Sequence, residues 1–201
     1  MITMKIPEKI FTYSFKPFVF ILLLLPAIHL GWGMWQDTLG ANPLEAIIRG
    51  LGDWALRFLL LTLALSPLRR LTGWGQILRL RRMLGLYAYF YALLHLLSYL
   101  WFDQFFDWIE IGYDIIERPF ITIGMVSMLL LTPLAITSTN AMMRRLGKHW
   151  KRLHQLIYLI AILATIHFFW MVKLDISEPT FYAIVLAILL GERVIYSLRQ
   201  R

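Results

Sequence analysis

Six apolar runs of about 20 residues each, separated by short charged segments, constrain the fold of this chain more than any other feature. A helix needs roughly 20 residues to cross the hydrocarbon core of a bilayer, where every backbone polar group must be satisfied internally. The sequence therefore predicts an all-α integral membrane protein, a six-transmembrane-helix bundle forming a single domain over residues 1–201. The expected spans are residues 15–34, 45–68, 83–102, 119–138, 154–173 and 176–195.

The composition supports this class and restricts the chemistry. Of the 201 residues, 59% are hydrophobic and 16% are charged, which is outside the range of soluble globular domains. Arg57 weakens the second run, and Glu192 with Arg193 weakens the sixth, so counts of five or four spans stay open. The first run lacks a small-residue cleavage site and is expected to be a retained span. Because the chain has no cysteine, redox chemistry requires a bound cofactor.

The charged segments alternate in sign along the chain. Basic residues dominate the N-terminal segment, the loops at 69–82 and 144–152, and the C-terminal tail; acidic residues dominate the remaining loops, most strongly 103–118. Because basic loops stay in the cytoplasm, both termini are expected there. The net charge of +8 follows from this topology, so it indicates membrane lipid as the surrounding partner and no nucleic acid.

Prolines refine the expected helix boundaries. Pro67 and Pro119 are expected at helix ends, because proline lacks an N–H donor and disfavours a helical residue before it. Pro133 is expected to kink the fourth span near its cytoplasmic end. We find no convincing internal repeat in the sequence.

Two histidines, His95 and His167, lie deep inside the third and fifth apolar runs. Counting from the cytoplasmic ends, they lie roughly 18 Å and 20 Å across a core of about 30 Å. Two neutral imidazoles at one depth are the axial ligands that a heme iron takes. The alternative is that each histidine hydrogen-bonds to a neighbouring helix and only stabilises packing.

His154 is a third candidate, 13 positions before His167. On an ideal helix these two rings point about 140° apart, and the position matching His154 before His95 is Arg82, so a second bis-histidine site is incomplete. Ligation by His154, contact with another cofactor and a place at the membrane interface all stay open. His149 is expected in solvent and His29 at the outer interface, with His29 as the reserve ligand.

Arginines supply two further candidates. Arg57 lies in the outer half of the second span, where it either pairs with a heme propionate or extends its long side chain to the interface. The adjacent Arg81 and Arg82, at an inner interface, suit a phosphate or carboxylate through bidentate hydrogen bonds. Positive-inside topology alone explains this arginine pair equally well.

Five segments together resemble the ferric-reductase-like transmembrane family, and most closely its heme-binding membrane subunits of periplasmic protein-methionine-sulfoxide reductase systems. The resemblance covers nearly the whole chain. The segments are SPLRR (66–70), LRLRRMLGLYAYFYALLHLLSY (78–99), ERPFITIG (117–124), ITSTNAMMRRLGKHWKRLHQLIYL (136–159) and ATIHFFWMVK (164–173).

The resemblance implies a b-type cytochrome of the bacterial inner membrane that passes electrons outward to a periplasmic molybdopterin-dependent methionine-sulfoxide reductase. His95 and His167 then match the ligands of one heme b, and His154 is the third histidine of the family. Bound FMN is also implied, with Arg81 and Arg82 as the positions for flavin contact. The implied electron donors are the quinone pool or a cytosolic flavin reductase.

Two other functions stay open at this stage. A related transmembrane reductase would reduce ferric chelates or oxygen at the outer surface, with its nicotinamide-binding domain on a separate protein. A cofactor-free transporter or assembly factor would use the histidines only for helix packing. No acid–base or nucleophilic catalytic residues are expected in the chain itself, so it is an electron-transfer subunit in the leading hypothesis.

Overall fold

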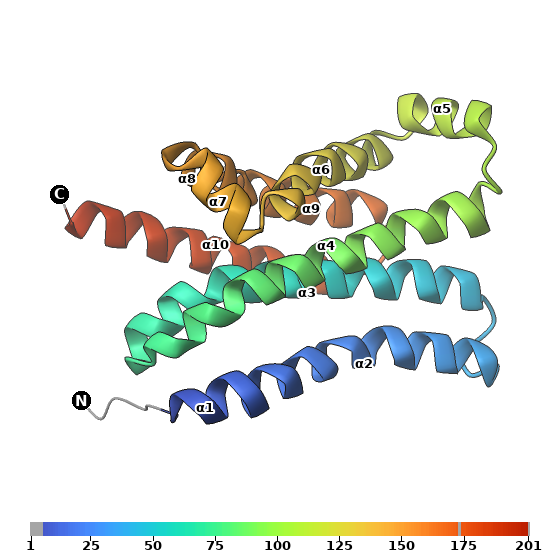
Figure 1. The fold of residues 1–201 in the computed structure, drawn as a ribbon. Helices are drawn as coiled ribbons and strands as arrows, with labels where there is room; N and C mark the ends of the chain where they lie inside the picture. Colours follow the sequence, from blue (N-terminus) through green and yellow to red (C-terminus); the bar gives the residue numbers. More distant parts are fainter. Residues whose placement is uncertain (1–5, 173, 201) are drawn as a thin grey trace. The chain divides into compact units, whose positions relative to one another are not determined.

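The structure is a computed structural model that describes residues 6–172 and 174–200. In this part of the chain, six helical stretches are long and apolar enough to cross a membrane (Figure 1). They are Glu8–Trp35, Pro43–Thr72, Gly75–Asp103, Pro119–Ile136, Lys148–Met171 and Ser177–Arg199. The expected six-helix architecture is confirmed, and the protein is a multi-pass membrane protein.

The chain divides into two compact units, Met1–Asp103 and Gln104–Arg201, and each is described by itself. The elements of the first unit are α1 (Glu8–Ile10), η1 (Phe11–Phe15), α2 (Lys16–Trp35), α3 (Pro43–Thr72), η2 (Gly75–Leu80), α4 (Arg81–Ser98) and η3 (Tyr99–Asp103). Those of the second unit are α5 (Trp108–Glu117), α6 (Pro119–Ile136), α7 (Asn140–Leu146), α8 (Lys148–His154), α9 (Leu156–Met171) and α10 (Ser177–Arg199).

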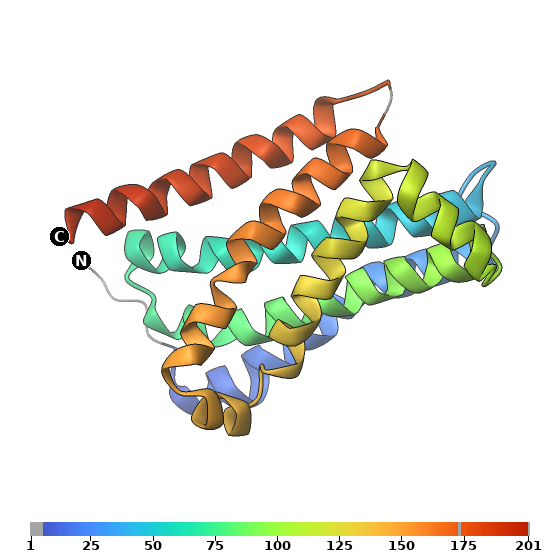
Figure 2. The same cartoon turned by 90° about the horizontal axis from the view of Figure 1, so that it is seen from above.

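The first unit is organised around the pair α3 and α4, which pack along their length (Figure 2). Phe58 of α3 is 1% exposed, and its ring centroid lies 5.1 Å from that of Tyr91 on α4. The hydroxyls of Tyr87 and Tyr91 donate to the carbonyls of Phe20 and Leu23 on α2, at 2.7 and 2.8 Å. Aromatic packing thus joins α3 to α4, and these two hydrogen bonds hold α2 against α4.

The second unit repeats the theme with α6 and α9 as its central pair, and α10 packs against α9 (Figure 2). Ala161 of α9 is fully buried. Lipid provides no hydrophobic driving force between membrane helices, so their contacts depend on close packing, which a small side chain such as alanine allows. Thr165 and Ser127 donate to the carbonyls four residues earlier, both at 2.8 Å. In the described residues no buried side-chain N or O atom lacks a partner, as an apolar surrounding requires.

Proline positions agree only in part with expectation. Pro119 is the first residue of α6, as expected. The expected helix end at Pro67 is wrong, because Pro67 is buried inside α3 and the helix continues to Thr72. It ends where Gly73 adopts a left-handed conformation (φ 70°) and its N–H bonds the carbonyl of Arg69 at 2.9 Å. Surrounding helices tolerate a proline in a membrane helix, whereas the left-handed glycine ends it.

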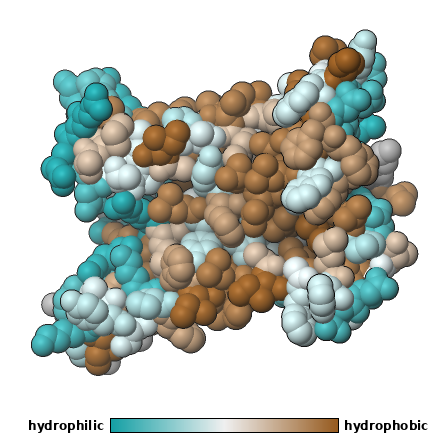
Figure 3. Space-filling model, turned by 45° about the vertical axis from the view of Figure 1, so that its right-hand side comes forward, coloured by the Kyte–Doolittle hydropathy of each residue, from teal (hydrophilic) through white to brown (hydrophobic). Residues whose placement is uncertain are grey.

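The surface has the pattern of a membrane protein. On the face drawn in Figure 3, hydrophobic residues gather over the middle stretches of helices and hydrophilic residues near helix ends. Many large apolar side chains are exposed, such as Phe18, Ile28, Leu129 and Ile188, each at least 58%. Such exposed apolar side chains are unfavourable in water and favourable in contact with the hydrocarbon core of a membrane.

Candidate functional site

His95 lies near the end of α4, against the first turns of α3. Its Nδ1 is 2.8 Å from the carbonyl oxygen of Ile48. Its ring also covers Gly52, where a Cβ would stand only 3.1 Å from Nδ1 and 3.2 Å from Cε1. The imidazole therefore occupies space that any side chain at Gly52 would fill.

His167 lies near the end of α9, against the first turns of α6, in the same manner. Its Nδ1 is 2.6 Å from the carbonyl oxygen of Phe120. A Cβ at Gly124 would stand 2.9 Å from Cε1 and 3.0 Å from Nδ1 of the ring. This contact is even tighter than the one at Gly52.

The two arrangements correspond residue by residue. In each, the carbonyl lies 47 residues before the histidine, and the glycine lies four residues after the carbonyl. The same sequence offset thus relates Ile48 to Phe120, Gly52 to Gly124 and His95 to His167. The structure contains a local repeat, one in each unit, where the sequence had shown no convincing one.

The helix geometry explains why a glycine accompanies each carbonyl. In an α-helix the side chain of residue i+4 lies on the same face as residue i and leans toward the N-terminus, over the carbonyl of residue i. A glycine at i+4 uncovers that carbonyl. The oxygen has two lone pairs, so it can accept the imidazole N–H besides the helical N–H.

These contacts define the tautomer of both histidines. A carbonyl oxygen can only accept, so Nδ1 carries the proton and Nε2 carries the lone pair. A neutral imidazole held through Nδ1–H to a carbonyl is the form in which histidine binds a metal through Nε2. Both residues therefore fit the role of axial heme ligands. They belong to different units, and each is positioned within its own.

His154, the last residue of α8, is held differently. Its Nε2 lies 3.1 Å from Oγ1 of Thr137, and that hydroxyl donates to the carbonyl of Pro133 at 2.6 Å. Oγ1 therefore accepts from Nε2–H, which places the proton on the opposite nitrogen from that in His95 and His167. The ring stacks on Trp150, with centroids 4.0 Å apart.

Of the remaining sequence candidates, Arg57 lies half-buried in the middle of α3, and the others are exposed. Arg81 and Arg82 are exposed at the start of α4, and Nη2 of Arg81 donates to Oγ of Ser66 at 2.6 Å. The guanidinium of Arg57 lies over the ring of Trp54, 4.8 Å from its centroid. The side chains of the two other histidines, in α2 and α8, are exposed: His29 and His149.

Sequence reasoning found the two histidines and missed their partners. Ile48 and Phe120 act through backbone carbonyls, which any residue has. The equal spacing of Gly52 and Gly124 before their histidines was the available signal. The described residues contain no cluster of three or more His, Cys, Asp or Glu side chains suited to a metal ion.

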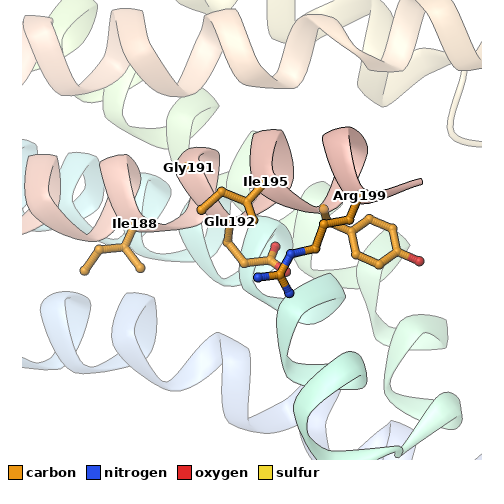
Figure 4. A pocket seen from close by; sticks show the side chains of 6 residues that line it. Ile188, Gly191, Glu192, Ile195 and Arg199 are labelled. Atoms are coloured by element: carbon orange, nitrogen blue, oxygen red, sulfur yellow. The ribbon is translucent and has the colours of Figure 1, made fainter. Parts of the chain in front are cut away.

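An open pocket lies along the second half of α10 (Figure 4). Ile188 and Ile195 give it apolar walls, and Glu192 and Arg199 lie on the same side of the helix. No histidine is among the residues that line it. The pocket therefore has no chemistry that relates it to the two histidine positions.

Comparison with known proteins identifies the class to which this six-helix membrane protein belongs. The family described as "Ferric reductase like transmembrane component" matches residues 51–189. This stretch includes α4, α6 and α9, and thus both histidine positions. No solved structure matches the chain.

Curated relatives narrow the class. A protein from Azospira oryzae is 54% identical over 92% of this chain and 81% of its own length. One from Herminiimonas arsenicoxydans is 50% identical over 92% of this chain and 87% of its own length, and one from Xanthomonas euvesicatoria is 54% identical over 89% and 85%. Each is named protein-methionine-sulfoxide reductase heme-binding subunit MsrQ. The chain belongs to the ferric-reductase-like transmembrane family and, within it, to the MsrQ proteins.

Proposed function

We propose that this chain is the b-type cytochrome subunit of a protein-methionine-sulfoxide reductase system in the bacterial inner membrane. It carries electrons from the cytoplasmic side to a periplasmic molybdopterin-dependent catalytic subunit (MsrP), which repairs oxidised proteins. His95 and His167 would hold one heme b as ligands of its iron. The relatives are named heme-binding subunits, and this chain holds two histidines in the form that binds a metal.

One observation carries the proposal: two deep histidines present the same tautomer, each fixed by a backbone carbonyl beside a glycine. Histidines that only stabilise helix packing have no need of one shared orientation at two separate places. A bound heme supplies a one-electron carrier in the apolar part of the membrane. The protein residues contribute the ligands, their orientation and the exclusion of water.

The surroundings of each histidine favour such a role. Phe120 lies with its ring centroid 6.3 Å from that of His167, and Leu51 and Ile121, which neighbour the glycine and carbonyl positions, are at most 9% exposed. Apolar neighbours lower the local dielectric and thereby tune the potential of a heme held there. The Nδ1–H bonds to carbonyls raise the basicity of both imidazoles, which favours the ferric state.

We further propose that the inner end of the first unit binds the phosphate of FMN through Arg81 and Arg82. Both arginines are exposed at the start of α4, and Ser66 orients the Arg81 guanidinium. Planar paired guanidinium groups suit the phosphate oxygens of FMN. The quinone pool or a cytosolic flavin reductase supplies the electrons. His154, at the inner end of the second unit, is a contact of another cofactor, and the alternative that it ligates iron as a third histidine is decided by the heme content.

The decisive experiment is an absorbance spectrum of the purified protein with heme quantified per polypeptide. We expect a reducible b-type spectrum in the wild type, lost in His95→Ala and His167→Ala. His149→Ala, at an exposed position of α8, is the matched control and retains it. A wild type without heme, or normal spectra in both ligand variants, would remove the proposal.

The same samples test the number of cofactors. We expect one heme per polypeptide, unchanged in His154→Ala. Two hemes in the wild type and one in His154→Ala would assign His154 as a ligand and replace the single-heme proposal. FMN binding is measured by flavin fluorescence in Arg81→Gln/Arg82→Gln, with Arg144→Gln/Arg145→Gln of α7 as the charge-matched control. Equal FMN affinity in both would contradict a flavin contact at Arg81 and Arg82.

A further inference from the structure

The two histidines are oriented by features that have no side chain of their own. Each imidazole donates to a carbonyl one helical turn before a glycine, at Ile48 and Gly52 in one unit and at Phe120 and Gly124 in the other. The ring lies over the glycine in both cases. Because the arrangement recurs at equal spacing on different helices, local accident does not explain it.

We propose that Gly52 and Gly124 are positioning residues for the heme ligands. Each glycine opens a seat in which the imidazole reaches the uncovered carbonyl and is fixed in tautomer and orientation. This inference rests on the proposed heme binding, and it adds residues that contact the ligand histidine but not the iron. We call each pair of glycine and carbonyl a histidine seat: Ile48 with Gly52 for His95, and Phe120 with Gly124 for His167.

The distances rank the two glycines. At Gly124 a Cβ would stand 2.9 Å from Cε1 and 3.0 Å from Nδ1 of the ring, whereas at Gly52 the closest distances are 3.1 and 3.2 Å. A ring tied to a carbonyl cannot give way without weakening that hydrogen bond. Alanine at Gly124 therefore disturbs its histidine more than alanine at Gly52 does.

The chain offers matched controls in both units. A Cβ at Gly85 of α4 would meet only Cγ2 of Thr62, at 3.9 Å, and a Cβ at Gly191 of α10 would meet nothing within 4 Å. Alanine favours a helix over glycine at all four positions. Any loss confined to the seat glycines is thus due to the histidine contact and not to helix propensity.

The first experiment compares heme retention and electron paramagnetic resonance of Gly52→Ala and Gly124→Ala with Gly85→Ala and Gly191→Ala. Loss of a partner that orients a metal ligand typically costs about 10- to 100-fold in affinity. We expect at least about 10-fold faster heme loss in Gly124→Ala, a smaller effect in Gly52→Ala and shifted low-spin g values in both. Wild-type g values and wild-type heme retention in both variants would overturn the proposal.

A second experiment keeps the test valid if an alanine variant does not fold. His167→Gly is purified, supplied with added heme, and titrated with imidazole and, separately, with 1-methylimidazole. Both bind heme iron, but 1-methylimidazole has no N–H to donate to the carbonyl of Phe120. We expect imidazole to restore the low-spin spectrum with at least about 10-fold higher affinity; equal restoration by both would overturn the role of the seat.

The two proposals fail in different ways. If the wild type carries no heme with two histidine ligands, the proposed function fails. Suppose instead that the wild type carries that heme, that Gly52→Ala and Gly124→Ala behave like the control variants, and that imidazole and 1-methylimidazole restore the spectrum equally. Then only the positioning role of the two glycines is wrong.

Discussion

Tyr91 shows how a single polar side chain is accommodated in an apolar helix pair. It is fully buried, its hydroxyl donates to the carbonyl of Leu23 at 2.8 Å and it accepts from the N–H of Ala27 at 3.0 Å. These two groups are one helical turn apart in α2, on either side of Pro26. Tyr91 thus bridges the backbone of a neighbouring helix at the turn where proline removes a donor.

We expect Tyr91→Phe to lower the free energy of unfolding by about 1–3 kcal/mol, because two backbone groups lose a partner in an apolar place. Tyr87→Phe, which removes one hydrogen bond to Phe20, serves as the comparison and should cost less. Thermal unfolding of the purified variants in one detergent measures both. A larger loss in Tyr87→Phe would contradict the bridging role of Tyr91.

At the residue scale, the sequence leads to side chains with distinctive chemistry but not to their backbone partners. His95 and His167 stand out because a polar ring deep in an apolar run is costly without a partner. Ile48 and Phe120 do not stand out, since their contribution is a carbonyl common to all residues. The same limit applies to Thr137, which engages His154 through a contact that depends on how α6 and α8 pack.

At the scale of elements, apolar length predicted the six long helices because a bilayer sets the length of a span. Helix ends were less predictable, since they depend on local conformation. Pro67 lies within α3, where packing tolerates it, while Gly73 ends the helix. The short helix α5 was not predicted, because its ten residues fall in a charged loop where an apolar run cannot be recognised.

The start of α5 depends on Asp107, whose side chain accepts from the N–H groups of Ile109 and Glu110 at 3.0 and 3.1 Å. We expect Asp107→Ala to destabilise α5 by about 1 kcal/mol, because an N-cap satisfies otherwise unpaired donors. Hydrogen exchange of the α5 amides should then speed up. Asp103→Ala removes the same charge from the same loop without removing this cap, so equal exchange in both variants would argue against capping.

The start of α10 should respond to acid. The Asp175 carboxylate accepts hydrogen bonds from the side chain and from the backbone N–H of Ser177. These bonds, that of the side chain most strongly, hold the pKa of Asp175 below its ordinary value. A lowered pKa means that the stabilisation is present above the ordinary pKa and is lost as the pH falls through the lower folded value. Hydrogen exchange at the first turn of α10 should therefore rise below about pH 4. In Asp175→Asn this acid-dependent rise should be absent; an unchanged rise would assign it to another group.

At the scale of the whole molecule, the charge of the loops predicts on which side of the membrane the two histidine seats lie. In each unit the histidine is near the end of one helix and its carbonyl near the start of the other, at the ends opposite to the basic segments 69–82 and 144–152. Since basic segments stay in the cytoplasm, both seats are expected toward the outer face. Arg81 and Arg82 are then on the cytoplasmic side. The proposed electron path therefore begins at a donor on the cytoplasmic side and ends at an acceptor on the outer side.

This orientation can be measured directly, because the chain has no cysteine and each introduced thiol is the sole target for a membrane-impermeant maleimide. In intact spheroplasts we expect labelling of Glu110→Cys in α5 and Glu178→Cys in α10, since both positions are exposed and belong to acidic outer segments. Lys9→Cys, Lys148→Cys and Gln200→Cys should react only after the membrane is permeabilised. Each side thus includes several positions, so a local defect in one variant cannot imitate an inverted chain. Labelling of the three inner positions from outside would reverse the topology, place both histidine seats at the cytoplasmic face and remove the proposed outward path to a periplasmic reductase.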